Sequence, residues 1–176
     1  MSEFKIINGS CAMQNVVAIV NAANRYLMSG GGICGVIFKM AGYDELIGEC
    51  RKIKVPLNDG DAVITSSCNI KNCKYIIHAV GPDFGKTPEA FDKLYAAYYN
   101  SLFLFMENEL HSISFPLISA GIFGYSLDNP ALVSAEMCFK AYNDFIKTYN
   151  DYFINVLLCA YTTNEYNECL KILNRK

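Results

Sequence analysis

Short apolar runs rich in valine and isoleucine alternate along this chain with longer stretches in which apolar residues recur at helical spacing. Apolar runs with few interruptions are typical of strands buried on both faces, as in parallel sheets that helices cover. The pattern therefore predicts an α/β domain with a largely buried sheet. The predicted strands are residues 4–8, 16–21, 61–65, 75–81, 112–119 and 153–160.

Helices are expected between these strands, and the clearest is predicted over residues 88–109. Its apolar face comprises Phe91, Leu94, Tyr95, Tyr98, Leu102, Phe105 and Met106. Thr87 before Pro88 is an expected start signal, and Asn129 before Pro130 repeats it for a helix that runs to about residue 149. In each pair the first side chain can cap the helix, and proline loses nothing at the first helical position. The expected architecture is a three-layer α/β/α sandwich with a mixed central sheet.

The composition narrows the class of protein further. The chain of 176 residues has no internal repeat or linker, so residues 1–176 are expected to form one domain. No uncharged apolar run is long enough to span a bilayer, and the first seven residues lack the pattern of a signal peptide. We therefore expect a monomeric cytoplasmic protein that does not associate with membranes.

The charge balance argues against general nucleic-acid binding. The net charge is -2 and the isoelectric point is near 5.7, and the basic residues form no stripe that would grip a phosphate backbone. A phosphate-bearing ligand would therefore have to be held by main-chain N–H groups and helix N-termini.

Eight cysteines are scattered through apolar segments without a CxxC pair, so we expect mostly buried, reduced thiols. The alternative is a structural metal, for which the closest ligand set is Cys68, Cys73 and His78. Part of that set lies along a predicted buried strand, and we expect neither a metal nor another cofactor. His78 is better explained by packing and a buried hydrogen bond, and His111 is expected at the surface.

Three segments follow predicted strands and depart from the strand–helix pattern. The first contains Asn21 and Asn24 and then the glycine run, Gly30, Gly31 and Gly32, which leads into a helix. Glycines permit positive φ angles and close backbone approach, and the first turn of a helix presents unpaired N–H groups. These features favour an anion site over the alternative of a flexible turn.

The second segment is the loop of residues 119–124, whose small residues would let main-chain amides approach the same anion. Phe123 offers an aromatic face to a sugar or base, although a phenylalanine is more often part of a core. The third segment is the end of the last predicted strand, where Tyr161 is either a stacking platform for a purine or a core residue. Ligands of open α/β sheets bind at such strand ends, so we expect one shared cleft.

Residues 17–24 with the glycine run, residues 75–82 and residues 119–124 resemble the signature stretches of macro domains, in the same order along the chain. The resemblance covers nearly the whole chain. Macro domains are α/β/α sandwiches that bind ADP-ribose, and many remove ADP-ribose from acidic side chains or deacetylate O-acetyl-ADP-ribose. The resemblance thus implies ADP-ribose or an ADP-ribosylated protein as the partner.

The resemblance also implies roles for individual residues. Asn24 would hydrogen-bond the distal ribose, and Phe123 would lie against that ribose, while Tyr161 would stack near adenine. One phosphate would be contacted by Gly30, Gly31, Gly32 and Ile33, and the other by Ser119, Ala120, Gly121, Ile122, Phe123 and Gly124. Further ligand contacts are expected from Ser10, Cys11, Asn21, Ala22 and Cys34. The expected catalytic residues are Asn24, Gly32 and Phe123.

Two departures from the family pattern bear on function. Many members carry an aspartate for the adenine amino group where this chain has Ser10, within Gly9-Ser10-Cys11-Ala12. MacroD-type members carry an aspartate where this chain has Cys34, which lowers the expected rate of turnover. Cys34 would gain nucleophilicity in the first turn of a helix, but no histidine partner is evident, so a packing role beside the cleft is favoured.

Two hypotheses of function follow. The leading hypothesis is a hydrolase of mono-ADP-ribosyl esters on Asp or Glu, or of O-acetyl-ADP-ribose, that uses a water held by the ligand's phosphate. The alternative is a reader that binds free ADP-ribose or ADP-ribosylated proteins without turnover.

Overall fold

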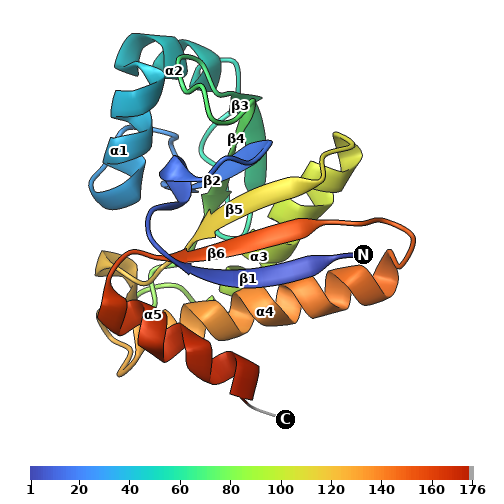
Figure 1. Ribbon diagram of the computed structural model, residues 1–176. Helices are drawn as coiled ribbons and strands as arrows, with labels where there is room; N and C mark the ends of the chain where they lie inside the picture. The colour runs from blue at the N-terminus through green and yellow to red at the C-terminus, as the bar shows by residue number, and fades with distance from the viewer. Residues whose placement is uncertain (175–176) are drawn as a thin grey trace.

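A computed structural model describes residues 1–174 and shows a six-stranded sheet in the order β1-β6-β5-β2-β4-β3 (Figure 1). The strands are β1 (Glu3–Asn8), β2 (Ala18–Ala23), β3 (Ala62–Ser66), β4 (Tyr75–Val80), β5 (Ser112–Pro116) and β6 (Asn155–Ala160). All neighbouring pairs are parallel except β3 with β4 at one edge. The predicted mixed sheet is therefore confirmed and all six predicted strands are present, although β5 ends at Pro116 instead of residue 119 and β2 begins and ends two residues later than predicted.

Helices cover the two faces of this sheet as separate layers. α1 (Gly32–Ala41) and α2 (Tyr43–Cys50) lie on one face, and α3 (Ala90–Glu107), α4 (Pro130–Thr148) and α5 (Thr163–Leu170) lie on the other (Figure 1). Short 3-10 turns occupy η1 (Cys11–Met13), η2 (Ile122–Gly124) and η3 (Lys171–Asn174). The predicted three-layer sandwich is confirmed.

The two faces of β2 and β4 belong to different apolar cores. Ala18 and Val20 pack into the core under α3 and α4, whereas Ile19 and Ala23 pack into the core under α1 and α2. Side chains alternate between faces along a strand, so Asn21 shares the α1 side with Ile19. In β4, His78 lies on that same side, directly across the ladder from Asn21. The alternation thus turns two polar groups inward beneath α1.

The two predicted helix starts differ in outcome. Asn129 caps α4 as expected, since its Oδ1 accepts a hydrogen bond from Leu132 N at 3.1 Å. Thr87 does not cap α3, which begins at Ala90 instead of residue 88. The Thr87 hydroxyl instead donates to Asp59 Oδ2 at 2.8 Å and accepts from Asp83 N at 3.2 Å. The Thr87 side chain is therefore used in these hydrogen bonds and not in the helix cap that the local pattern predicted.

All eight cysteines are free, and all but Cys68 are buried. No three His, Cys, Asp or Glu side chains within residues 1–174 are arranged to hold a metal ion, so the Cys68, Cys73 and His78 set is not assembled. In the same part of the chain, no helix is both long enough and apolar enough to cross a membrane. His111 is exposed, as expected, and its Nδ1 pairs with the Phe153 carbonyl at 2.8 Å.

Candidate ligand-binding site

The segments singled out in the sequence all follow the carboxyl ends of parallel strands. Residues 9–11 follow β1, residues 24–34 follow β2, residues 119–124 lie beyond β5, and Tyr161 follows β6. Because these strands are parallel, their carboxyl ends meet at one edge of the sheet, where ligands of open α/β sheets bind. The fold thereby brings the predicted site residues to a common edge.

Two neighbouring glycines at the start of α1 have different backbone conformations. Gly31 precedes the helix with φ -84° and ψ -176°, which any residue can adopt, whereas Gly32 has φ +56°. The expectation of positive φ is therefore met by Gly32 alone. All three glycines are exposed and Ile33 is partly buried. The run therefore leaves main-chain N–H groups open to solvent at the positive end of the helix dipole.

Gly35 completes this turn, a role that was not predicted from the sequence. A Cβ atom at Gly35 would lie 2.6 Å from the Gly30 carbonyl oxygen, so only glycine lets the run fold back against its own helix. A glycine inside a helical stretch was the available signal, because such a residue usually has a packing reason.

Asn24 shapes the loop that precedes the glycine run. Its Oδ1 accepts from Tyr26 N and Met28 N, both at 3.1 Å, and its Nδ2 donates to the Met28 carbonyl at 2.7 Å. The side chain is partly exposed, and an amide carries two hydrogens, so one N–H remains for a ligand. Asn24 therefore has a structural task in addition to the predicted ligand contact. Ala22, just before it, is partly buried.

Asn21 lies below the surface, with only 1% of it exposed. Its Nδ2 is 3.1 Å from His78 Nδ1 and 3.7 Å from Cys34 Sγ. The side chain is therefore enclosed beneath the glycine run and does not line its outer surface. His78 is itself fully buried, and burial lowers its pKa to about 4, so the ring is neutral and serves a buried hydrogen bond as expected.

The loop of residues 119–124 is held close to the segment after β4. Ser119 has φ +57° and its hydroxyl donates to the Pro82 carbonyl at 2.7 Å. A Cβ at Gly124 would lie 2.4 Å from the Ser119 carbonyl oxygen, so the loop needs glycine there. Phe84 N donates to the Phe123 carbonyl at 2.8 Å. These contacts fix a tight loop whose outer residues, Gly121 and Ile122, are exposed while Ala120 is partly buried.

The aromatic side chains near this edge are available to a ligand. Tyr161 is 78% exposed and Phe123 is 38% exposed, so neither is a core residue and that alternative is wrong for both. A pocket of about 300 Å³ lies between Ala120, the start of α4 and the start of α5, the helix that follows Tyr161.

Ser10 and Cys11 follow β1 in a short helical turn. The Ser10 hydroxyl accepts from Ala12 N at 3.3 Å, and Ser10 is partly exposed. The Cys11 side chain is buried, with its thiol 3.5 Å from the Val20 carbonyl. Only the backbone of Cys11 can therefore face a ligand.

Cys34 sits in the first turn of α1 but does not have the character of a nucleophile. The residue is 5% exposed, and burial raises the pKa of its thiol despite hydrogen bonds at Gly30 and Asn21. The disfavoured alternative, a nucleophilic thiol with a lowered pKa, is therefore wrong, because desolvation outweighs the two hydrogen bonds that lower the pKa. The packing role is confirmed, since Cys34 belongs to the core under α1.

Comparisons with known proteins agree with this geometry. A family model described as the macro domain matches residues 20–133. A Salmonella typhimurium protein named O-acetyl-ADP-ribose deacetylase is 39% identical over 153 residues, which cover 84% of this chain and 82% of that protein.

Two solved structures share the fold over nearly the full chain. The macrodomain of Oceanobacillus iheyensis with ADP matches with a TM-score of 0.86 and 30% identity, covering 98% of this chain and 90% of that one. The Trypanosoma brucei macrodomain in complex with ADP-ribose matches with a TM-score of 0.83 and 26% identity, covering 97% of this chain and 68% of that one. The match of the family model, together with these relatives, shows that the chain belongs to the macro domain family.

Proposed function

We propose that this protein binds ADP-ribose and hydrolyses O-acetyl-ADP-ribose or mono-ADP-ribosyl esters on Asp and Glu side chains. The observation that carries the proposal is the glycine run at the start of α1, which shares one edge of the sheet with the small-residue loop of residues 119–124. Both segments offer main-chain N–H groups, which suit a diphosphate in a chain without a basic stripe. The named Salmonella relative supports the ester chemistry.

Most of the predicted site residues have a proposed part in this binding, whereas the buried side chains of Asn21 and Cys34 have none. The free N–H of Asn24 would reach the distal ribose, with Phe123 against the same sugar and Tyr161 stacked near adenine. Ser10 and the backbone of Cys11 would lie on the adenine side. The proposed phosphate contacts are Gly30, Gly31, Gly32 and Ile33 on one side, and Ser119, Ala120, Gly121, Ile122 and Gly124 on the other.

The proposed hydrolysis depends on positioning. None of the proposed site residues carries a carboxylate, and the pKa of the Cys34 thiol is raised, so this thiol stays protonated at neutral pH. A water held by the ligand's phosphate would attack the ester carbonyl or the anomeric carbon. Attack at the ester carbonyl breaks its bond to the ribose oxygen, which takes up the proton lost by the water as the carboxylic acid is released. Attack at the anomeric carbon instead breaks its bond to the carboxylate oxygen, which leaves as the acid with that proton. Asn24, Gly32 and Phe123 would act by holding the ligand in the reactive orientation.

We also propose that the whole chain acts as one monomeric domain in the cytoplasm. β1 and β6, near opposite ends of the chain, pair in the same sheet, which supports a single domain. Eight free cysteines are typical of a reducing compartment, which supports the location.

One experiment separates the hydrolase from a reader of ADP-ribosyl marks. The protein is incubated with a glutamate-linked ADP-ribosylated substrate and with O-acetyl-ADP-ribose, and product release is followed, while calorimetry measures ADP-ribose binding. Binding with release supports the hydrolase. Binding without release of either product establishes the reader, and absence of binding refutes both.

A further inference from the structure

A chain of buried hydrogen bonds runs from β3 through β4 and β2 to the start of α1. The Thr65 hydroxyl is 3.0 Å from His78 Nε2, His78 Nδ1 is 3.1 Å from Asn21 Nδ2, and Asn21 Nδ2 is 3.7 Å from Cys34 Sγ. The Cys34 thiol then donates to the Met28 carbonyl at 3.6 Å, the same oxygen that accepts from Asn24. The chain thus links the sheet to both ends of the segment that carries the glycine run.

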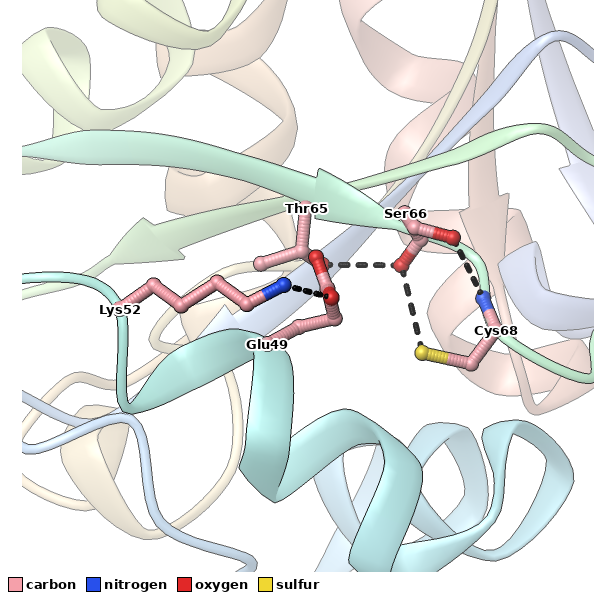
Figure 2. A network of polar contacts seen from close by, with 5 residues as sticks. All are labelled: Glu49, Lys52, Thr65, Ser66 and Cys68. Carbon is pink, nitrogen blue, oxygen red and sulfur yellow. Dashed lines mark hydrogen bonds and ion pairs between the residues drawn. The ribbon is translucent and has the colours of Figure 1, made fainter.

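The contacts of Thr65 determine which atoms donate and which accept along this series of hydrogen bonds. The Thr65 hydroxyl donates to the Ser66 carbonyl at 3.0 Å. The Cys68 thiol donates to the same carbonyl, and the Cys68 main-chain N–H donates to the Ser66 hydroxyl (Figure 2). Since the Thr65 hydrogen is used there, its oxygen accepts from His78 Nε2–H. His78 Nδ1 is then the acceptor for Asn21, and both amide hydrogens of Asn21 are committed, one to His78 and one to Cys34.

If Asn21 served only to fill space, its buried side chain would lower the stability of the fold. Its Oδ1 is buried and has no hydrogen-bond partner within the described part of the chain. Leaving a buried acceptor unpaired costs roughly 1 to 3 kcal/mol. Such groups in folded proteins call for an explanation other than packing.

We propose that Asn21 is a positioning residue, which acts through Cys34 and the Met28 carbonyl to fix the glycine run and the first turn of α1 relative to the sheet. Its contribution to ligand binding rests on the function proposed above, whereas its effect on the order of the glycine run does not. Asn21 would raise affinity by holding the N–H groups in one orientation before the ligand arrives, which spares the cost of ordering them.

A pair of substitutions at Cys34 tests this series of hydrogen bonds. Cys34→Ser keeps a group that accepts from Asn21 and donates to Met28, whereas Cys34→Ala removes both bonds at similar volume. The matched control is Cys50→Ala, a buried thiol of the same core that makes no hydrogen bond within the described residues. Calorimetry should show that Cys34→Ala weakens ADP-ribose binding about five- to tenfold while Cys34→Ser and Cys50→Ala stay within about twofold of the parent.

A double-mutant cycle tests whether Asn21 acts through Cys34. If it does, Asn21→Ala should weaken binding in the parent but add little in a Cys34→Ala background, because the connection is already broken. Additive losses would overturn the proposal. Equal binding by Cys34→Ala and Cys34→Ser would overturn it as well, since the proposal requires the serine to rescue.

Two measurements on the free protein separate this proposal from the proposed function. NMR of the imidazole nitrogens in the parent should find His78 protonated at Nε2 and not at Nδ1. A proton at Nδ1 would refute the proposed series of hydrogen bonds, and this result does not depend on whether the variants fold. Hydrogen exchange at the Gly31 and Gly32 amides should accelerate in Cys34→Ala and not in Cys50→Ala. Absence of ADP-ribose binding by the parent would reject the proposed function alone, whereas unchanged exchange would reject the positioning role.

Discussion

Gly31 and Gly32 are neighbours in the glycine run, yet the structure predicts different consequences for a side chain at each. A Cβ atom at either position meets no other atom within 4 Å, so neither substitution clashes inside the protein. Gly31 has an ordinary extended backbone with φ -84°, whereas Gly32 has φ +56°. The two positions therefore separate backbone strain from ligand exclusion.

The expected magnitudes follow from those angles. Forcing a residue with a Cβ into the left-handed region costs roughly 1 to 2 kcal/mol, and each kcal/mol lowers the melting temperature of a domain of this size by about 2 to 4 °C. Gly32→Ala should therefore melt about 2 to 8 °C below the parent. Gly31→Val should melt within about 2 °C of the parent, because no strain is introduced.

The order of effects on binding is reversed. In the proposed site, a valine side chain at Gly31 would stand where the phosphate approaches the main-chain amides, and each lost hydrogen bond to a charged group costs roughly 1.5 to 3 kcal/mol. Gly31→Val should therefore bind ADP-ribose about 10- to 100-fold more weakly than the parent. AMP, which lacks the diphosphate and distal ribose, should bind far more weakly than ADP-ribose to the parent.

The assay combines thermal unfolding without ligand and calorimetry with ADP-ribose on the parent and both variants. A Gly31→Val protein of normal stability and unchanged affinity would remove the glycine run from the phosphate site. A Gly32→Ala protein as stable as the parent would show that its backbone is not held at positive φ.

Further substitutions test other parts of the site and the core. Asn24→Ala should reduce any turnover more than ADP-ribose affinity, which single-turnover and calorimetric measurements separate; a variant that turns over substrate as fast as the parent would make Asn24 structural. Ser10→Asp should keep its cap and tighten ADP-ribose binding by about tenfold or more in calorimetry, and a null result would place adenine recognition elsewhere. Cys34→Asp should raise single-turnover ester release up to roughly 100-fold, with lower stability because the residue is buried, and a fast parent slowed by this change would refute the proposed route. His78 has a pKa of about 4 in the folded state against an ordinary value of 6.5, so the unfolded state binds the extra proton and stability falls as pH drops from about 6.5 to about 4, by up to about 3 kcal/mol. Urea midpoints across that range should show this slope in the parent and lose it in His78→Gln, and a parent without the slope would mean that His78 is not buried neutral.

The strands and most helices could be predicted because their signals are local. Valine and isoleucine runs marked all six strands, and Asn129 with Pro130 marked the start of α4. The failure at Thr87 shows the limit of local signals. Its hydroxyl has the chemistry of a cap, but Asp59, distant along the chain, binds it in the folded protein.

Candidate site residues could be located to segments but not given their individual environments. The sequence marked the glycine run, yet did not indicate that Gly32 alone adopts positive φ or that Gly35 must let Gly30 approach. It placed Cys34 at a helix start, where a dipole would lower the thiol's pKa, whereas packing against the core raises that pKa. Burial depends on the neighbours that the whole fold supplies, so no local pattern reports it.

The sequence by itself determined the class of fold, the elements and the segments that lie near the candidate ligand-binding edge, because apolar periodicity, glycine and capping residues act over a few positions. Tertiary structure alone decided which side chains meet. Asn21 and His78 are 57 residues apart, and only the parallel pairing of β2 with β4 sets them side by side beneath α1. Desolvation and hydrogen-bond partners depend on which side chains are neighbours in the folded protein. For this reason the neutral state of His78, the protonated thiol of Cys34 and the unpaired amide oxygen of Asn21 could be recognised only in the tertiary structure.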